Sequence, residues 1–195
     1  MHYFHTMAEA PITLYNGVRD VVGIQTTFAE FMNRKAYDYL TGDEKRALPC
    51  ITVGGQFRRR KLAELIAPSG IVQLDIDAKD NQHIEDWREV VETLALESCA
   101  ESYSAISASG NGAFALYFLP SLLHIHETEG ADAYLDAHRW ATNDIANQLY
   151  YESGLIADGS CINRPNGLRF ISADQDAIHR TLIQAQPNHG LPCVA

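Results

Sequence analysis

The stretch IVQLDID, residues 71–77, decides the fold class that this sequence predicts. Apolar residues at positions 72, 74 and 76 alternate with polar residues at 73, 75 and 77, and a period of two is typical of a β-strand. We therefore expect a strand over 71–77 that packs one face into the core and carries Asp75 and Asp77 side by side on the other.

Helical and strand patterns alternate along the chain on both sides of this strand. The patterns predict further strands over 12–15, 49–53, 103–107, 113–119 and 168–172. They predict helices from Thr26 or Thr27 to about Leu40 and over 60–67, 84–96 and 132–151. Because the loop 108–112 is typical of a hairpin, we expect an α+β fold with packed helices on a mixed or antiparallel sheet, not a parallel doubly wound one.

Length and composition indicate one globular domain. The chain has 195 residues, of which 46% are hydrophobic and 21% charged. We expect residues 1–183 to form the domain and 184–195, which are punctuated by Pro and Gly, to be a tail or linker. The longest apolar run, 113–119, is too short for a bilayer span, and the first residues lack the pattern of a secretory signal. The expected location is therefore cytoplasmic, with no membrane association.

The four cysteines lie far apart in the sequence, at positions 50, 99, 161 and 193. They form no Cys-x-x-Cys motif and no Cys/His pair at the spacing of zinc ligands. We expect reduced, mostly buried thiols.

Charge is distributed unevenly. The net charge of −10 argues against coating of nucleic acid by bulk electrostatics. Residues 34–61 nevertheless carry eight basic against three acidic residues and end in Arg58, Arg59, Arg60 and Lys61. This cluster is either a solvated surface or a patch that contacts phosphates.

Asp75 and Asp77 are the strongest candidates for chemistry. Two carboxylates side by side on one strand repel each other unless a proton or a cation stabilises them. Mg²⁺ or Mn²⁺ is the natural partner, as in phosphoryl and nucleotidyl transfer, whereas ordinary surface acids are the alternative.

Two further features could serve a metal–phosphate site. The loop 107–112, Ser-Ala-Ser-Gly-Asn-Gly, could cradle phosphate oxygens with backbone N–H groups, although a hairpin without a ligand would look the same. Asp158 could supply a third carboxylate. Arg169, within a predicted strand, needs a partner, which is either a triphosphate or one of the carboxylates in a structural ion pair.

Two other enzyme classes share parts of this pattern. His124 and His126, at the expected end of a strand, with Tyr150 and Tyr151 downstream, outline the HUH endonucleases that nick single-stranded DNA. An Asp-x-Asp pair after an apolar strand also opens the haloacid-dehalogenase-like phosphohydrolase site. Lys79, however, stands where that site usually has Thr or Val.

In their order, these motifs resemble the archaeo-eukaryotic primase superfamily, the primase-polymerases, and most closely the branch of the virulence-associated protein E N-terminal domain. The resemblance begins near Lys45, includes the Asp-x-Asp strand and the 107–112 loop, and ends with the stretch 158–174, in which Asn163 belongs to the pattern. It implies an RRM-like sheet joined to a smaller N-terminal αβ unit.

The resemblance also implies roles for individual residues. Asp75, Asp77 and Asp158 would bind catalytic Mg²⁺ or Mn²⁺, and Ser107, Ser109, Gly110, Gly112 and Arg169 would hold the phosphates of a nucleoside triphosphate. The cluster at 58–61 would contact a DNA template and primer, and a fused or separate helicase is an expected partner. Phe114 and Asn111 stand where many members of the family have a His and a basic residue.

The residues themselves predict a metal–phosphate site. The resemblance implies that this site belongs to a metal-dependent nucleotidyltransferase of DNA replication, of a mobile element or phage type. The alternative within the same fold is an inactive primase-like module that binds nucleotides or single-stranded nucleic acid.

Overall fold

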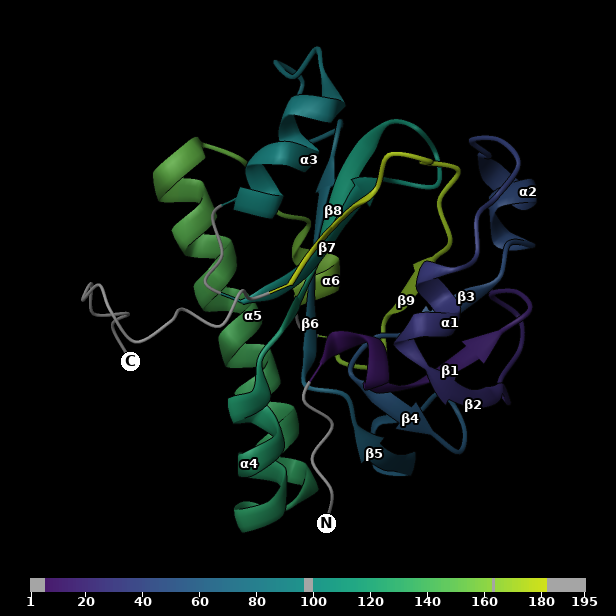
Figure 1. Ribbon diagram of the computed structural model, residues 1–195, viewed down its shortest axis with the longest axis vertical. Helices are drawn as coiled ribbons and strands as arrows, with labels where there is room; N and C mark the ends of the chain where they lie inside the picture. Colours follow the sequence, from purple (N-terminus) through teal and green to yellow (C-terminus); the bar gives the residue numbers. More distant parts are fainter. Residues whose placement is uncertain (1–5, 97–99, 163, 182–195) are drawn as a thin grey trace.

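The computed structural model describes residues 6–96, 100–162 and 164–181 (Figure 1). Its strands are β1 (Pro11–Tyr15), β2 (Ile24–Thr27), β3 (Cys50–Thr52), β4 (Gly55–Phe57), β5 (Leu65–Pro68), β6 (Ile71–Asp77), β7 (Glu101–Ile106), β8 (Gly112–Phe118), β9 (Leu168–Phe170) and β10 (Ile178–Arg180). Its helices are α1 (Phe28–Met32), α2 (Gly42–Arg46), α3 (Trp87–Leu96), α4 (Pro120–Glu129), α5 (Ala131–Ser153) and α6 (Gly159–Ile162), with 3-10 turns η1 (Met7–Glu9) and η2 (Leu62–Glu64).

The central sheet has the strand order β10-β7-β8-β6, and every neighbouring pair is antiparallel. β7 and β8 form the expected hairpin, and β6 lies along the other edge of β8. In this register Asp75 faces Phe114 and Asp77 faces Gly112. The structure confirms the predicted α+β class with an antiparallel sheet.

A second sheet, of order β2-β1-β3-β9, combines strands from the N-terminal and the C-terminal parts of the sequence. Its first three strands come from the N-terminal third, whereas β9 arrives from the other side of the central sheet and pairs with β3, so that Arg169 faces Ile51. A separate hairpin of β4 and β5 lies beside this sheet (Figure 1). The smaller N-terminal unit is thus completed by a C-terminal strand.

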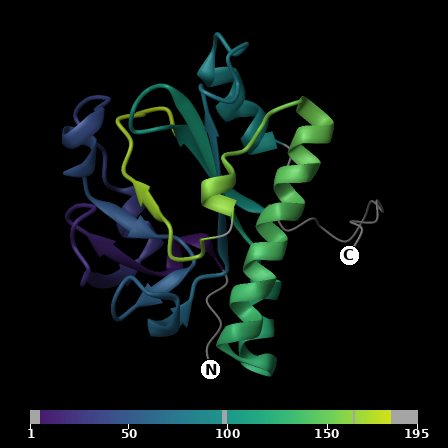
Figure 2. The same cartoon turned by 180° about the vertical axis from the view of Figure 1, so that it is seen from behind.

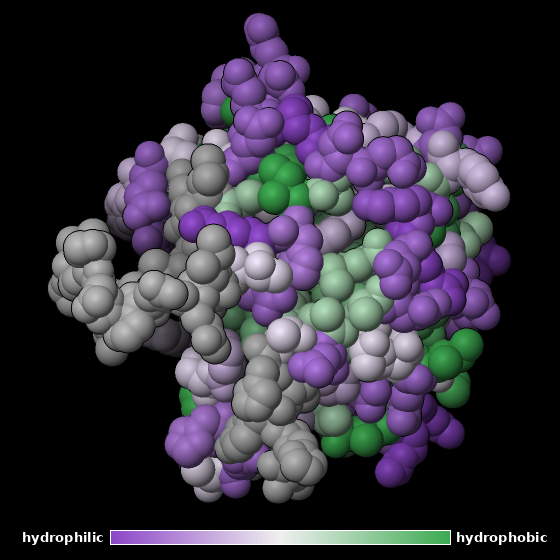
Figure 3. All heavy atoms as spheres, in the orientation of Figure 1, coloured by the Kyte–Doolittle hydropathy of each residue, from purple (hydrophilic) through white to green (hydrophobic). Residues whose placement is uncertain are grey.

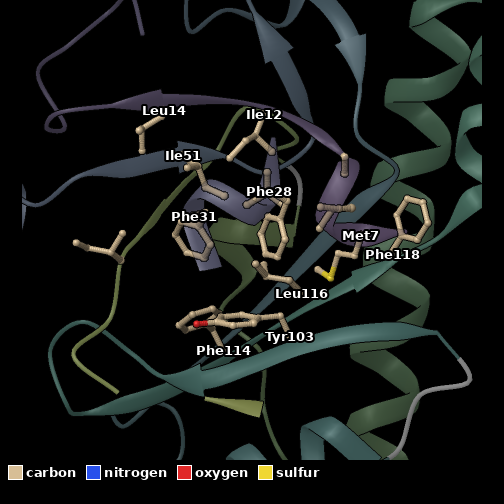
Figure 4. Packing of buried hydrophobic residues seen from close by; sticks show 14 of the residues in the cluster. Met7, Ile12, Leu14, Phe28, Phe31, Ile51, Tyr103, Phe114, Leu116 and Phe118 are labelled. Carbon is tan, nitrogen blue, oxygen red and sulfur yellow. The ribbon is translucent and has the colours of Figure 1, made fainter. Parts of the chain in front are cut away.

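Each face of the central sheet covers its own hydrophobic core. On one face, side chains of β6 and β8 pack against α3, α4 and α5, and Figure 2 shows α5 running the length of this side. On the other face, Tyr103 and Phe114 meet Phe28 and Phe31 of α1, beneath the strands of the second sheet (Figure 4). The face of β6 that carries Asp75 and Asp77 therefore points toward the second sheet and is partly buried by it.

Two predicted helices are wrong. The helix expected to reach Leu40 ends at Met32, because the following residues bond to the C-terminal segment: Ala36 N–H donates to Ser172 O and Lys35 Nζ donates to Asp174 O. The helix expected over 60–67 is a 3-10 turn followed by β5, which pairs with β4. In both places contacts distant in sequence override the local pattern.

The predicted helix over 84–96 begins three residues later than expected. The Asp86 carboxylate accepts the backbone N–H of Arg88 at 2.7 Å, which caps the helix at that point. The predicted strands and the long helix α5 are confirmed within one to two residues at each end; β9, expected to reach residue 172, ends at Phe170.

Hydrophilic residues cover most of the face in Figure 3, and apolar residues form small separate patches there. No helix among the described residues combines the length and the apolar character that a membrane span needs. Cys50 is a buried free thiol, and burial raises its pKa to about 12. Cys99, Asn163, Cys193 and the expected tail 184–195 lie outside the described residues, and the side chain of Cys161 is not described.

Candidate functional site

The candidate site lies at the C-terminal end of β6, on the face that points toward the second sheet. Asp75 and Asp77 project from this face as the alternation predicts, and their side chains are 17% and 33% exposed. Two half-buried carboxylates in one place need counter-charges, and the structure supplies a different one to each.

Arg169 is the counter-charge of Asp75. Its Nη2 and Nη1 atoms donate to the two carboxylate oxygens of Asp75 at 2.7 and 3.2 Å, and its side chain is only 6% exposed. The guanidinium also lies 4.5 Å from the ring centroid of Phe114, the residue opposite Asp75 on β8. Of the two partners expected for Arg169, the structure contains the carboxylate.

Asp158 reaches the site through a buried clamp. The side chain of Asn81 donates to the carbonyl oxygens of Asp77 and Ile156 at 3.0 and 2.9 Å, and its own oxygen accepts the Ile156 N–H at 2.9 Å. Two residues later, the Asp158 N–H donates to the Asp75 carbonyl at 2.7 Å. A segment about 80 residues downstream is thereby fixed alongside β6, as expected for the third carboxylate.

The Lys79 ammonium lies among three carboxylates at the centre of this arrangement. Its Nζ is 3.3 Å from Asp77 Oδ2, 3.4 Å from Asp158 Oδ1 and 3.7 Å from Asp80 Oδ2. Lys79 and Asp80 were not among the predicted site residues. The spacing Asp-x-Asp-x-Lys-Asp could have indicated them. Lys79 and Asp80 lie in the turn directly after β6, and such a turn can bring its side chains close to the end of the strand.

Burial and charge shift the pKa values of these groups in opposite directions. Burial raises the pKa of Asp77, and the neighbouring charge of Asp75 raises it further against the effect of Lys79. For Asp158, burial raises the pKa, but hydrogen bonds from Ser160 and the Lys79 charge outweigh it and leave the pKa below its usual value. The Lys79 charge thus acts on both carboxyl groups in the same direction and lowers the pKa of each.

The donor chemistry fits a hard divalent cation. Carboxylate oxygens from Asp77, Asp80 and Asp158 already surround one positive charge, and Mg²⁺ and Mn²⁺ prefer such oxygens. The oxygens lie more than 3 Å from the ammonium nitrogen, whereas a magnesium–oxygen bond is about 2.1 Å, so these side chains must close in around a metal. Among the described residues, no three His, Cys, Asp or Glu side chains are arranged as ligands of one ion.

The 107–112 loop ends beside Asp77. Its Asn111 carbonyl accepts the Ala78 N–H at 3.3 Å, and Ser107 Oγ lies 3.1 Å from Ser109 Oγ. Gly112 approaches the neighbouring strand so closely that a Cβ would lie 2.5 Å from the Ile76 carbonyl, and Gly110 has a φ of +75°. The structure thus brings Ser107, Ser109, Gly110 and Gly112 to the same end of β6 as the carboxylates.

The basic cluster at 58–61 lies apart from the carboxylates, on the turn of the β4–β5 hairpin. Arg60 bonds to the carbonyl oxygens of Val18 and Val21, and Arg58 lies 3.7 Å from Glu64. Arg58, Arg59 and Lys61 are exposed. Arg60 thus joins this cluster to the loop between β1 and β2, and the other three basic side chains lie at the surface.

The histidine pair lies on a helix, not at the end of a strand as expected. His124 and His126 belong to α4, where residues two positions apart point away from each other, and His126 packs against the ring of Tyr134 at 5.9 Å. Tyr150 and Tyr151 are exposed near the C-terminal end of α5. Pro120 starts α4 at its first turn, which is the reason that the strand ends before the pair.

Replacing Asn81 by alanine is expected to lower the free energy of unfolding by about 1–3 kcal/mol, because partly buried backbone groups of Asp77 and Ile156 lose their partners. Chemical denaturation measures this loss. The neighbouring exposed Gln82, replaced by alanine, is the control and should change stability by less than about 0.5 kcal/mol. Equal, small effects of both substitutions would contradict the clamp.

Among known proteins, the chain matches a family model. No curated protein and no solved structure matches the sequence significantly. A family model, "BT4734-like, N-terminal domain", matches residues 43–158. The match runs from α2 to Asp158 and includes Asp75, Asp77 and the 107–112 loop, but it stops before Arg169. Because it covers more than half of the 195 residues, the chain belongs to the BT4734-like N-terminal domain family.

Proposed function

We propose that the protein is a metal-dependent nucleotidyltransferase of DNA replication, related to the primase-polymerases and acting in the cytoplasm. One observation carries the proposal. Asp75, Asp77 and Asp158, from two distant segments, meet at the end of one strand, beside Arg169 and a glycine-bearing loop. Nucleotidyl transfer requires two components. One is a set of carboxylates that hold a metal, and the other is a set of cationic or N–H donors that bind phosphates.

Mg²⁺ or Mn²⁺, when bound, would lower the pKa of a primer 3′-hydroxyl and stabilise the charge on the leaving pyrophosphate. Asp77 and Asp158 are the residues placed to hold it, with Asp80 next to them. Phe114 and Asp75 fix the guanidinium of Arg169, which would orient phosphate oxygens of a nucleoside triphosphate from the buried side. The loop 107–112 would approach the same phosphates with its backbone.

A template strand would lie against the exposed basic side chains of the 58–61 cluster. These residues belong to the one strongly basic segment of an acidic chain, and phosphate contacts of this kind position nucleic acid without reading its sequence. A DNA primer and template, nucleoside triphosphates and a fused or separate helicase are the proposed partners.

Primer extension tests this proposal. A labelled primer on a DNA template, supplied with Mg²⁺ or Mn²⁺ and mixed nucleotides, should be extended by the protein. Asp77→Asn should abolish extension, because it removes one charge of the metal site at nearly constant volume. Asp144→Asn, at an exposed position on α5, is the matched control and should retain it. Extension that survives Asp77→Asn would reject the metal assignment.

A second candidate is a module that binds nucleotides or single-stranded nucleic acid without catalysis. The observation that favours it is the bidentate pairing of Arg169 with Asp75, which engages both oxygens of one expected metal ligand. Phe114, in place of the histidine that many primase-polymerases have, favours it as well. Calorimetry distinguishes the two functions: metal-dependent binding of a triphosphate without any extension would support the binding module.

A further inference from the structure

We propose that Lys79 is a resident counter-ion of the site. Its ammonium lies among the carboxylates that would hold the metal, and it would move to the phosphates when a metal–triphosphate complex binds. This inference rests on the proposed function and adds two points to it. It assigns Lys79 as a phosphate-binding residue, and it makes the binding of metal and of triphosphate mutually dependent.

The position of the ammonium is the first argument. Nζ contacts carboxylates from β6, from the turn that follows it and from the segment before α6, at 3.3, 3.7 and 3.4 Å. Three carboxylates thus converge on a single ammonium. A divalent ion at the same point would match the surrounding charge better than a single ammonium does.

The second argument is that the Lys79 ammonium can move, whereas the Arg169 guanidinium is fixed. The Lys79 side chain is 60% exposed and has a flexible four-carbon stem, so its ammonium can leave the carboxylates without disturbing the core. Arg169 is 6% exposed, donates twice to Asp75 and lies over Phe114, so it is fixed. Lys79 is therefore the cation that a metal would displace.

The destination of the ammonium is the third argument. A metal that enters alone forces the ammonium into water, where it loses three carboxylate partners. A metal that enters with a triphosphate brings new oxygens within reach of the same side chain, and phosphate is a strong acceptor for Lys. Each ligand should therefore bind more tightly in the presence of the other, and by the same factor.

The test measures Mn²⁺ binding by calorimetry, with and without a non-hydrolysable nucleoside triphosphate. In Lys79→Gln, bare Mn²⁺ should bind roughly three- to tenfold more tightly than in the wild type, because its competitor is gone. Triphosphate, measured in the presence of Mn²⁺, should bind roughly tenfold more weakly. Arg46→Gln removes the same charge from a 66% exposed position on α2, outside the carboxylate cluster, and should change neither affinity by more than about twofold.

Unchanged or weaker Mn²⁺ binding in Lys79→Gln would overturn the proposal, and so would the absence of Mn²⁺ binding from both proteins. The result does not depend on catalysis. If Lys79→Gln gains Mn²⁺ affinity while the wild type extends no primer, the counter-ion assignment stands and the nucleotidyltransferase activity falls. Thermal unfolding of both variants should match the wild type, because both side chains are exposed.

Discussion

Replacing Arg169 by alanine is expected to lower the free energy of unfolding by about 3–5 kcal/mol. The substitution leaves Asp75, at 17% exposure, without the two hydrogen bonds that neutralise it, and it removes the cation that packs on Phe114. A buried charge that loses its partner costs more than the pair itself contributes. Urea unfolding followed by circular dichroism measures the loss.

Two further variants make this result specific to the ion pair. Arg58→Ala, which removes a 77% exposed arginine 3.7 Å from Glu64, should cost less than about 0.5 kcal/mol. The double variant Asp75→Asn with Arg169→Ala should recover part of the stability lost in Arg169→Ala, since the carboxylate charge that the guanidinium neutralised is then also gone. A loss below about 1 kcal/mol in the single variant would show that Asp75 does not depend on Arg169.

Acidification from pH 6.5 to 4 is expected to remove about 3 kcal/mol of stability through one residue, His138. His138 is fully buried on α5, with Nε2 2.8 Å from the Ile71 carbonyl, and burial lowers its pKa to about 4. The unfolded chain binds a proton near pH 6.5, whereas the folded protein does so only near pH 4. The unfolded state therefore gains protons first, and stability is complete above pH 6.5 and declines below it.

The difference between wild type and His138→Gln isolates this contribution from the carboxylates that titrate in the same range. Glutamine can still donate to the Ile71 carbonyl, so the variant should be less stable at pH 7 but should lose less stability toward pH 4. The imidazole signals of His138 in an NMR titration provide a second measurement. A midpoint near 6.5 for those signals would contradict the buried, neutral ring.

The sequence was sufficient to predict the elements whose pattern is local. Alternation over 71–77 predicted β6 and the shared face of Asp75 and Asp77, and helical spacing predicted α5 within two residues of its observed ends. The glycine-bearing loop predicted the β7–β8 hairpin. In each of these places local propensity and tertiary packing favour the same structure.

The contacts that organise the site depend on pairings that no local pattern contains. Asp75 and Arg169 are 94 residues apart in the sequence. A charged residue in a strand needs a partner, but the sequence alone does not decide whether Arg169 pairs with a carboxylate or with a phosphate. Asn81 lay in a polar stretch that gave no sign of a buried clamp to Ile156. The helical pattern over 60–67 includes Leu65, whose pairing partner Phe57 becomes apparent only once β4 and β5 lie side by side.

The path of β9 sets a practical limit on how the domain can be divided. The family match ends at Asp158, which makes that residue a natural place to cut an expression clone. A fragment that stops there lacks β9 and β10, exposes the edges of β3 and β7 and omits the guanidinium that neutralises Asp75. Unpaired strand edges promote aggregation, so a stable fragment must extend at least to Arg180, about 20 residues beyond the family boundary.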